Sequence, residues 1–201
     1  MIHNIQFESD ADKSIDLAVN SLKKGELIVY PTDTLYSIGC DIFNKRSVEK
    51  IYKIKKLRKN KPLSFICSDF KHLSEYANVS NKAFRLMKDI LPGPFTCILP
   101  ATRKVPKIMV SKQRTVGIRI PDNDFIRNVV QRLDNPIVTT TLPSIGEKTL
   151  LDPSAMYHHF KDKVEMFFSN GSSFSDPSTV LDLSSLTFTL LRQGKGHIDI
   201  L

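Results

Sequence analysis

Long apolar runs are missing from this 201-residue sequence, and no stretch reaches the roughly 18 uninterrupted apolar residues that a membrane helix needs. The first residues, MIHNIQFESDADKS, contain neither the basic region nor the apolar region of a secretory signal peptide. Cysteine is scarce as well, because Cys40, Cys67 and Cys97 form no CxxC pair and lie among apolar residues. These absences predict a cytoplasmic protein with no membrane partner, no disulfide framework and no metal site.

Motifs of the common catalytic and phosphate-binding sites are also missing. No GxxxxGKS/T loop is present, no GxGxxG follows a strand, and neither GxSxG nor HExxH occurs. The five histidines show no metal-ligand spacing, and no pair of carboxylates stands out by its position. A nucleotide or another ligand must therefore be bound by a different arrangement of residues.

The positive charge of the chain is concentrated in one segment. Nine Lys and Arg residues lie between Lys45 and Lys61 against a single acid, Glu49, so this segment carries the net charge of the whole chain, +8. Such a run can be a solvated helix face with a charged loop, or it can bind the phosphates of a nucleotide or of RNA. Lys50 and Lys53 are candidate RNA-binding residues because they face outward on the predicted helix.

Apolar periodicity and turn residues predict helices that alternate with strands. Helices are expected after Asp10, after Ser47 with Val48, Ile51 and Ile54 inward, after Ser80 with Phe84, Met87 and Ile90 inward, over 124–133, and after Asp152. Strands are expected over 25–30, 62–68, 95–99, 115–120, 136–142, 164–169, 179–183 and 188–192. With no internal repeat and no linker, this alternation predicts one α/β domain with helices packed on a mixed, twisted sheet.

Polar residues recur at the ends of the predicted strands. They are Thr34, Arg119, Thr139 to Thr141, Ser178, Thr179 and Arg192. A Thr is common in strands, and an Arg at a strand end often does no more than cover the surface. In an open α/β sheet, however, ligands bind at strand ends, and the repetition in one chain favours a binding site there.

Several segments together resemble the YrdC/YciO family, whose best-known members make threonylcarbamoyl-AMP. The similar segments are PTDTLYSIGCD, IYKIKKLRKNKPLSFIC, LPGPFTCIL, TVGIRIPDN, PIVTTTLPSIG, STVLDL and LLRQGKG, in the family's order and approximate spacing over residues 15–196. The resemblance implies a single YrdC-like α/β domain over residues 1–201. It further implies a twisted open mixed sheet, a positively charged concave surface and a short C-terminal tail at 197–201.

The resemblance also implies a reaction and a set of site residues. L-Threonine and bicarbonate form a carbamate that attacks the α-phosphorus of ATP, which carries Mg²⁺, and pyrophosphate leaves; tRNA-modification proteins later transfer the threonylcarbamoyl group to tRNA. Such chemistry needs mainly positioning and cations. The residues implied are Lys55 and Arg58 as catalytic phosphate contacts, and Thr34, Lys56, Thr115, Arg119, Thr139, Thr141, Ser178 and Arg192 as contacts to substrate or nucleotide, with Thr34 at the threonine.

Some positions depart from the synthase pattern and resemble the YciO branch. Leu57 stands where the Lys-x-Arg-Pro motif of the synthases has its arginine, and Pro143 stands where their Ser-x-Asn motif has its asparagine. Ile66 replaces a histidine of the synthase pattern, and Ser37 replaces a glycine. An alternative function is therefore a YciO-like protein that binds nucleotide and double-stranded RNA with weak or no synthase activity. A third is a metabolic protein acting on another nucleotide or acyl carbamate.

Overall fold

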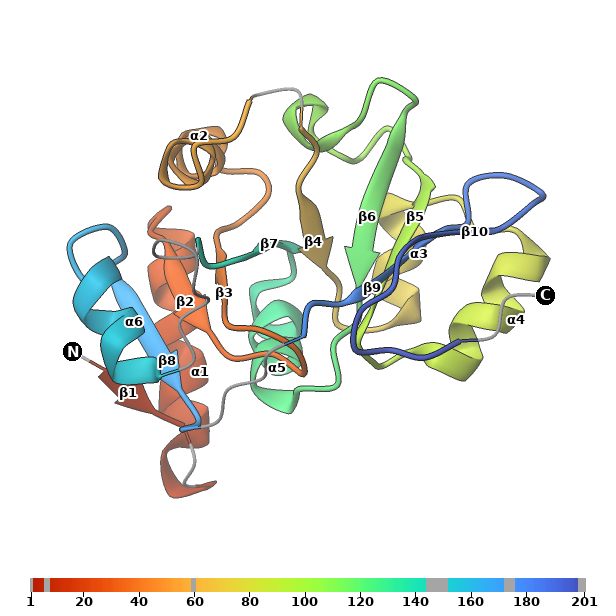
Figure 1. The fold of residues 1–201 in the computed structure, drawn as a ribbon. Coiled ribbons are helices and arrows are strands. Elements are labelled where there is room, and N and C mark those ends of the chain that lie inside the picture. The colour runs from red at the N-terminus through yellow and green to blue at the C-terminus, as the bar shows by residue number, and fades with distance from the viewer. Residues whose placement is uncertain (1, 6–7, 59–60, 144–151, 172–175, 199–201) are drawn as a thin grey trace.

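A ten-stranded mixed sheet organises the chain. The structure is a computed structural model that describes residues 2–5, 8–58, 61–143, 152–171 and 176–198. The strand order is β1-β8-β2-β3-β7-β4-β6-β5-β9-β10, with parallel and antiparallel neighbours (Figure 1). The strands are β1 (Ile2–Asn4), β2 (Ile28–Tyr30), β3 (Ser37–Gly39), β4 (Ser64–Ile66), β5 (Phe95–Pro100), β6 (Thr115–Arg119), β7 (Ile137–Thr141), β8 (Met166–Ser169), β9 (Thr179–Asp182) and β10 (Thr189–Arg192). The predicted α/β class is confirmed.

Most of the helices begin where the sequence supplies a side-chain cap. The helices are α1 (Glu8–Lys23), α2 (Lys45–Ile54), α3 (Phe70–Tyr76), α4 (Asn81–Ile90), α5 (Asp124–Leu133) and α6 (Pro153–Phe160), with the short 3₁₀ helix η1 (Lys107–Met109). Ser80 accepts a hydrogen bond from Ala83 N, and Asp152 caps α6 with Pro153 in its first turn, as predicted. Among the described residues, no helix is long and apolar enough to cross a bilayer.

Two predicted caps are wrong. Helix α1 begins at Glu8, so Asp10 lies inside it. In α2 the cap is Asn44, whose side chain accepts from Ser47 N, while the Ser47 hydroxyl donates to Gly25 O at 2.5 Å. Ser47 is therefore committed to a contact with the turn before β2, which a local sequence pattern does not reveal.

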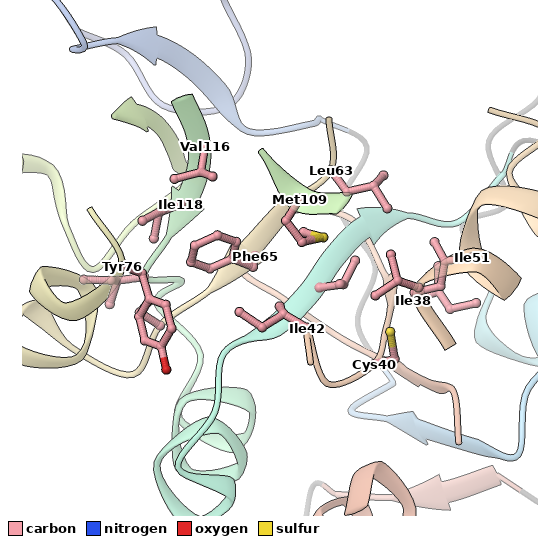
Figure 2. Close-up of a cluster of buried hydrophobic side chains, with 14 of the residues drawn as sticks. Ile38, Cys40, Ile42, Ile51, Leu63, Phe65, Tyr76, Met109, Val116 and Ile118 are labelled. Carbon is pink, nitrogen blue, oxygen red and sulfur yellow. The ribbon is translucent and has the colours of Figure 1, made fainter. Parts of the chain in front are cut away.

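Each face of the sheet has its own apolar cluster, because successive side chains on a strand point to opposite faces. Helices α1 and α5 pack together over one face, against residues that include Ile28, Ile137 and Phe168. The opposite face carries the larger cluster, which joins the sheet to α2, α3, α4 and α6 and includes Phe65 and Ile118 (Figure 2). The α1–α5 pair covers part of its face and leaves the rest open for a pocket.

Local sequence patterns misjudge some elements that tertiary contacts decide. Phe84 was predicted to face inward, yet it is 43% exposed and its ring lies edge-on to Phe70, 5.5 Å away between centroids. Strand β3 forms inside PTDTLYSIGCD, where no strand is predicted, because Ile38 and its neighbours pair with both β2 and β7. The chain therefore returns into the sheet after Tyr36.

Candidate functional site

A pocket of about 560 Å³ lies on the open part of the sheet. Its floor is built largely from alternate residues of neighbouring strands, and in β6 these are Thr115, Gly117 and Arg119. Ile118 belongs to the apolar core, and Val116 contributes to both the core and the lining. The register places Ser64 of β4 beside Gly117 on one side and Thr139 of β7 on the other. The strand period of two therefore produces a floor of small and polar side chains directly above the core.

Gly117 is required for this close packing. A Cβ atom at this position would lie 2.6 Å from Ser64 Oγ and 3.3 Å from Thr96 Cγ2. The missing side chain lets the hydroxyl of Ser64 lean over β6, so the floor has a polar group where a larger residue would stand.

Hydroxyl groups make up most of the uncharged polar part of the lining, and the lining also contains apolar residues such as Leu57 and Ile98. The hydroxyls come from β3, β4, β5, β6 and β7 and from the segments beside them, namely Thr34, Ser37, Ser64, Thr96, Thr115, Thr139, Thr140, Thr141 and Ser178. Thr96 Oγ1 and Ser178 Oγ lie 2.8 Å apart and share a hydrogen bond. Hydroxyls can donate and accept, which suits a ligand with several polar oxygens.

Arg119 is the central charged group of the pocket. Its Nη2 donates to Asp33 Oδ1 at 2.7 Å and to Thr34 Oγ1 at 3.0 Å, and the two charged side chains are only 6% and 8% exposed. Burial lowers the pKa of Arg119, and the neighbouring Asp33 acts in the opposite direction. The PTDT segment thus supplies the counter-charge of an arginine that follows it by 86 residues.

The PTDT segment is held in a tight turn by its own hydroxyls. Thr32 Oγ1 accepts from Thr34 N at 3.0 Å and donates to Leu35 O at 2.9 Å. Asp33 Oδ2 accepts from Asp122 N at 3.1 Å, and Lys195 Nζ donates to Asp33 O at 2.6 Å. Pro31 therefore leads out of β2 into a turn that is fixed from both sides, and Thr34 is left facing the pocket.

The charged residues of the described lining are all basic: Lys55, Lys61, Arg119 and Arg192. Lys55 Nζ donates to Thr141 O, and burial, followed by the charge of Lys61, lowers the pKa of Lys55. Arg192 donates from Nε and Nη2 to Ser178 O at 3.1 and 2.7 Å, and burial lowers the pKa of Arg192. Cations gathered in a partly dehydrated pocket favour an anionic ligand.

One buried donor of the lining, Arg119 Nε, has no hydrogen-bond partner within the described residues. The Thr139 hydroxyl is buried as well and interacts with the Tyr30 hydroxyl. Because buried polar atoms in folded proteins are almost always bonded, the unbonded Nε is an unusual feature of the Arg119 guanidinium group.

Most of the sequence-predicted binding residues meet in this pocket. Its lining includes Thr34, Lys55, Thr115, Arg119, Thr139, Thr141, Ser178 and Arg192. The structure does not bring Lys56 and Arg58 into the lining, because both are exposed beyond the end of α2, where Lys56 adopts a positive φ of 51°. Lys50 and Lys53 lie elsewhere, in a groove of about 450 Å³ beside Lys161 and Lys163.

Sequence reasoning missed several residues of the site. Asp33 lies inside the PTDT motif, but the sequence does not predict its role, since its partner Arg119 is distant in the chain. Ser64 and Thr96 look like ordinary strand residues, and Lys195 belongs to a Gly-Lys-Gly stretch too short to weigh alone. For Ser64 the sequence does contain a usable signal. Ser64 lies two residues before Ile66, the position where the synthase pattern has a histidine, so the two side chains lie on the same face of β4.

The donor set of the pocket does not resemble a metal centre. The described residues contain no group of three or more His, Cys, Asp or Glu side chains that could hold a metal ion. The cysteines are buried thiols, and burial raises the pKa of Cys97 to about 12, so the neutral form persists near pH 7. The chemistry of the pocket rests on hydroxyls and cations.

Comparison with known proteins places this geometry in a family. The family model described as "Telomere recombination", which covers Sua5, YciO and YrdC, matches residues 20–194. The uncharacterized protein YciO of Escherichia coli is 35% identical over 95% of this chain and 94% of its own length. Its crystal structure superposes with a TM-score of 0.91 over 100% of this chain and 99% of that one.

Two more distant relatives have more informative names. A threonylcarbamoyl-AMP synthase of Coxiella burnetii is 30% identical over 78% of this chain and 84% of its own length. The crystal structure of Pyrococcus abyssi Sua5 complexed with L-threonine is 26% identical, with a TM-score of 0.88 over 96% of this chain and 57% of that one. From the family match over most of its length and the shared fold, we conclude that the chain belongs to the Sua5/YciO/YrdC family.

Proposed function

We propose that the pocket binds ATP and L-threonine and that the protein forms threonylcarbamoyl-AMP. The observation that carries the proposal is the lining itself, in which Lys55, Lys61, Arg119 and Arg192 surround a hydroxyl floor and no acid lines the described part of the pocket. ATP, pyrophosphate and a threonine carbamate are all anions that such a lining attracts. Membership in a family with named threonylcarbamoyl-AMP synthases supports the same choice.

The reaction can proceed without a catalytic base from the protein. L-Threonine, as the free amine, and bicarbonate form a carbamate and release water; a carbamate oxygen then bonds to the α-phosphorus of ATP while the bond to the bridging oxygen of pyrophosphate breaks. Negative charge accumulates on the phosphoryl oxygens and on the leaving pyrophosphate. Lys55, Lys61 and Arg192 can neutralise that charge in a partly dehydrated site, where electrostatic stabilisation is strongest.

Magnesium belongs to this proposal as part of the substrate. ATP carries the ion on its phosphate oxygens, and Mg²⁺ commonly retains several waters when bound through phosphates. The floor hydroxyls of Ser64 and Thr96 can hydrogen-bond such waters. We assign no carboxylate ligand, because Asp33 already pairs with Arg119.

Threonine is assigned to the end of the pocket formed by Thr34, Arg119 and Thr139. The side chains of Arg119 and Thr139 line this end and can bind the carboxylate and hydroxyl of the amino acid. Transfer of the product to tRNA requires further proteins, which we expect to take threonylcarbamoyl-AMP directly as their substrate.

A second function is favoured by two residues of the lining. Leu57 and Pro143 face the pocket at the positions where the synthase pattern has Arg and Asn. Loss of a charge-assisted contact and a buried hydrogen bond each costs on the order of 1.5–3 kcal/mol. A protein that binds nucleotide and amino acid with weak catalysis would have this composition.

The two functions are separated by one assay with a matched variant. Purified protein is incubated with ATP, L-threonine and bicarbonate, and pyrophosphate release and product mass are followed. Release that requires both threonine and bicarbonate, with the product mass of threonylcarbamoyl-AMP, supports the synthase. The double variant Leu57→Arg with Pro143→Asn should then release pyrophosphate at least about tenfold faster, since each tenfold needs about 1.4 kcal/mol. Binding of both ligands without release supports the second function, and threonine-independent release contradicts both.

A further inference from the structure

Arg119 is bonded along one side of its guanidinium group. Nη2 contacts Asp33 Oδ1 and Thr34 Oγ1, whereas Nε is buried and has no partner in the described part of the chain. An arginine fork is planar, so fixing Nη2 also fixes the direction in which Nε points. The position of Asp33 therefore determines how the guanidinium group of Arg119 is oriented relative to the pocket.

Asp33 is itself held from two distant parts of the chain. Its second carboxylate oxygen accepts from Asp122 N, just after β6, and its backbone oxygen accepts from Lys195 Nζ in the C-terminal segment. The C-terminal segment is anchored by its own contacts, because Lys195 N donates to Pro177 O and Gly194 N donates to Thr179 Oγ1. Asp33 thus has contacts at its carboxylate and its backbone that do not involve Arg119.

We propose that Asp33 is a positioning residue that orients Arg119 toward the ligand, and that Lys195 positions the turn carrying Asp33. The bound group is an oxyanion, either the carboxylate of the amino acid or a phosphate of the nucleotide, and this identification rests on the proposed function. Arg119 is the ligand contact; Asp33 and Lys195 act through it. The C-terminal segment thereby takes part in the site at both Arg192 and Lys195.

Charge and positioning make opposite predictions for one substitution. Asp33→Asn removes a negative charge beside a pocket lined by cations, so simple electrostatics predicts tighter anion binding. If Asp33 orients Arg119, the same substitution must weaken binding. The two carboxylate oxygens of Asp33 accept from Arg119 and from Asp122 N, and in Asn one of these oxygens is replaced by an NH₂ group, which cannot accept from either donor. The sign of the change therefore decides between the two roles.

The test combines ligand titration with a signal from Arg119 itself. L-Threonine, ATP and pyrophosphate are titrated by calorimetry into the wild type, Asp33→Asn and Lys195→Met. The side-chain Nε–Hε resonance of Arg119 is followed by NMR and assigned by its loss in Arg119→Lys. Matched controls are Asp41→Asn, a half-buried carboxylate outside the lining, and Lys82→Met, whose Nζ donates to Leu186 O at 3.3 Å.

We expect a sharp Arg119 resonance in the wild type and in both controls. In Asp33→Asn and in Lys195→Met the resonance should be broadened or shifted. The oxyanion bound by Arg119 should lose about tenfold or more in affinity in Asp33→Asn, as expected when a charge-assisted contact is misaligned. Loss with L-threonine alone identifies the carboxylate, and loss with pyrophosphate and ATP identifies the phosphate. If Asp33→Asn fails to fold, Lys195→Met decides by the Arg119 resonance, because the loss of a positive charge weakens anion binding under either role.

An unchanged Arg119 resonance in the folded variants, or tighter binding of the ligands, would overturn the positioning role. Absence of any binding by the wild type would instead refute the proposed function. In that case the Arg119 resonance still tests the positioning role, because this measurement is made on the protein without ligand.

Discussion

Lys55 Nζ donates to the backbone oxygen of Thr141 at 2.5 Å, joining the residue after helix α2 to the last residue of strand β7 across the rim of the pocket. The half-buried amine is held in place by a carbonyl rather than by a carboxylate. Its charge is therefore not cancelled by that partner.

Replacing Lys55 with Met should weaken ATP binding by about tenfold or more while lowering the free energy of unfolding by about 1 kcal/mol, the usual net value of one hydrogen bond. Calorimetry and urea unfolding measure the two effects. Lys53→Met, on the exposed side of α2, is the matched control and should leave ATP binding unchanged. Equal affinity in both variants would show that Lys55 does not contact the nucleotide.

Replacing Arg119 with Ala should destabilise the fold as well as the site. The substitution leaves the Asp33 carboxylate, 8% exposed, without its ion-pair partner, and breaking a buried pair costs about 3–5 kcal/mol. Denaturant unfolding of Arg119→Ala, Asp33→Ala and the double variant checks the pair, and additive single effects would contradict the coupling.

The pH dependence of stability should carry a contribution from His72. Burial lowers the pKa of His72, which lies beside Ser68 and Tyr76 and near Asp69, Glu75 and Lys104. The unfolded chain then binds more protons than the folded chain below about pH 6.5, so this contribution is complete above that pH and is lost as pH falls through the folded pKa.

Unfolding by urea at about pH 7.5 and about pH 5 measures this effect. His72→Phe keeps a ring against Tyr76 and should reduce the difference in stability between the two pH values. His158→Phe changes an exposed histidine of α6 and serves as the control. A wild-type pH difference that persists in His72→Phe would assign it to other groups.

The basic groove beside α2 leads to a prediction about RNA. Lys50 and Lys53 lie there with Lys161 and Lys163, although Lys50 also pairs with Glu165 at 3.6 Å. Double-stranded RNA contacting this groove should bind largely without sequence preference and weaken as salt rises.

The double variant Lys50→Gln with Lys53→Gln should lower RNA affinity and reduce the salt slope by about two, roughly one for each lost phosphate contact. Lys71→Gln with Lys88→Gln removes the same charge from exposed positions of α3 and α4. Filter binding at several salt concentrations compares the pairs. Equal effects would reduce the RNA interaction to general attraction by a basic protein.

The sequence predicts helices and strands better than it predicts which side chains contact one another. Strand β6 and the cap at Ser80 follow from patterns that are local, and both are confirmed within a residue or two. Phe84 shows the limit, since the spacing in α4 allows a face through Phe84 and Met87 or one through Ala83 and Met87, and the structure buries the second. The pairing of Asp33 with Arg119 shows it again for the site, because two residues far apart in sequence meet only once the sheet has formed.

The placement of the site on central strands should also determine how fast the backbone amides of its floor exchange with solvent. The floor strands β4, β6 and β7 are central and mostly buried, whereas all four residues of the edge strand β10 are exposed. Amides of Ile118 and Val138 should therefore exchange by global unfolding, while β10 should exchange through local fraying. A ligand that binds the native state slows global unfolding exchange by a factor set by its concentration and Kd. Deuterium uptake at Ile118 and Val138 can therefore rank candidate ligands without any assay of catalysis.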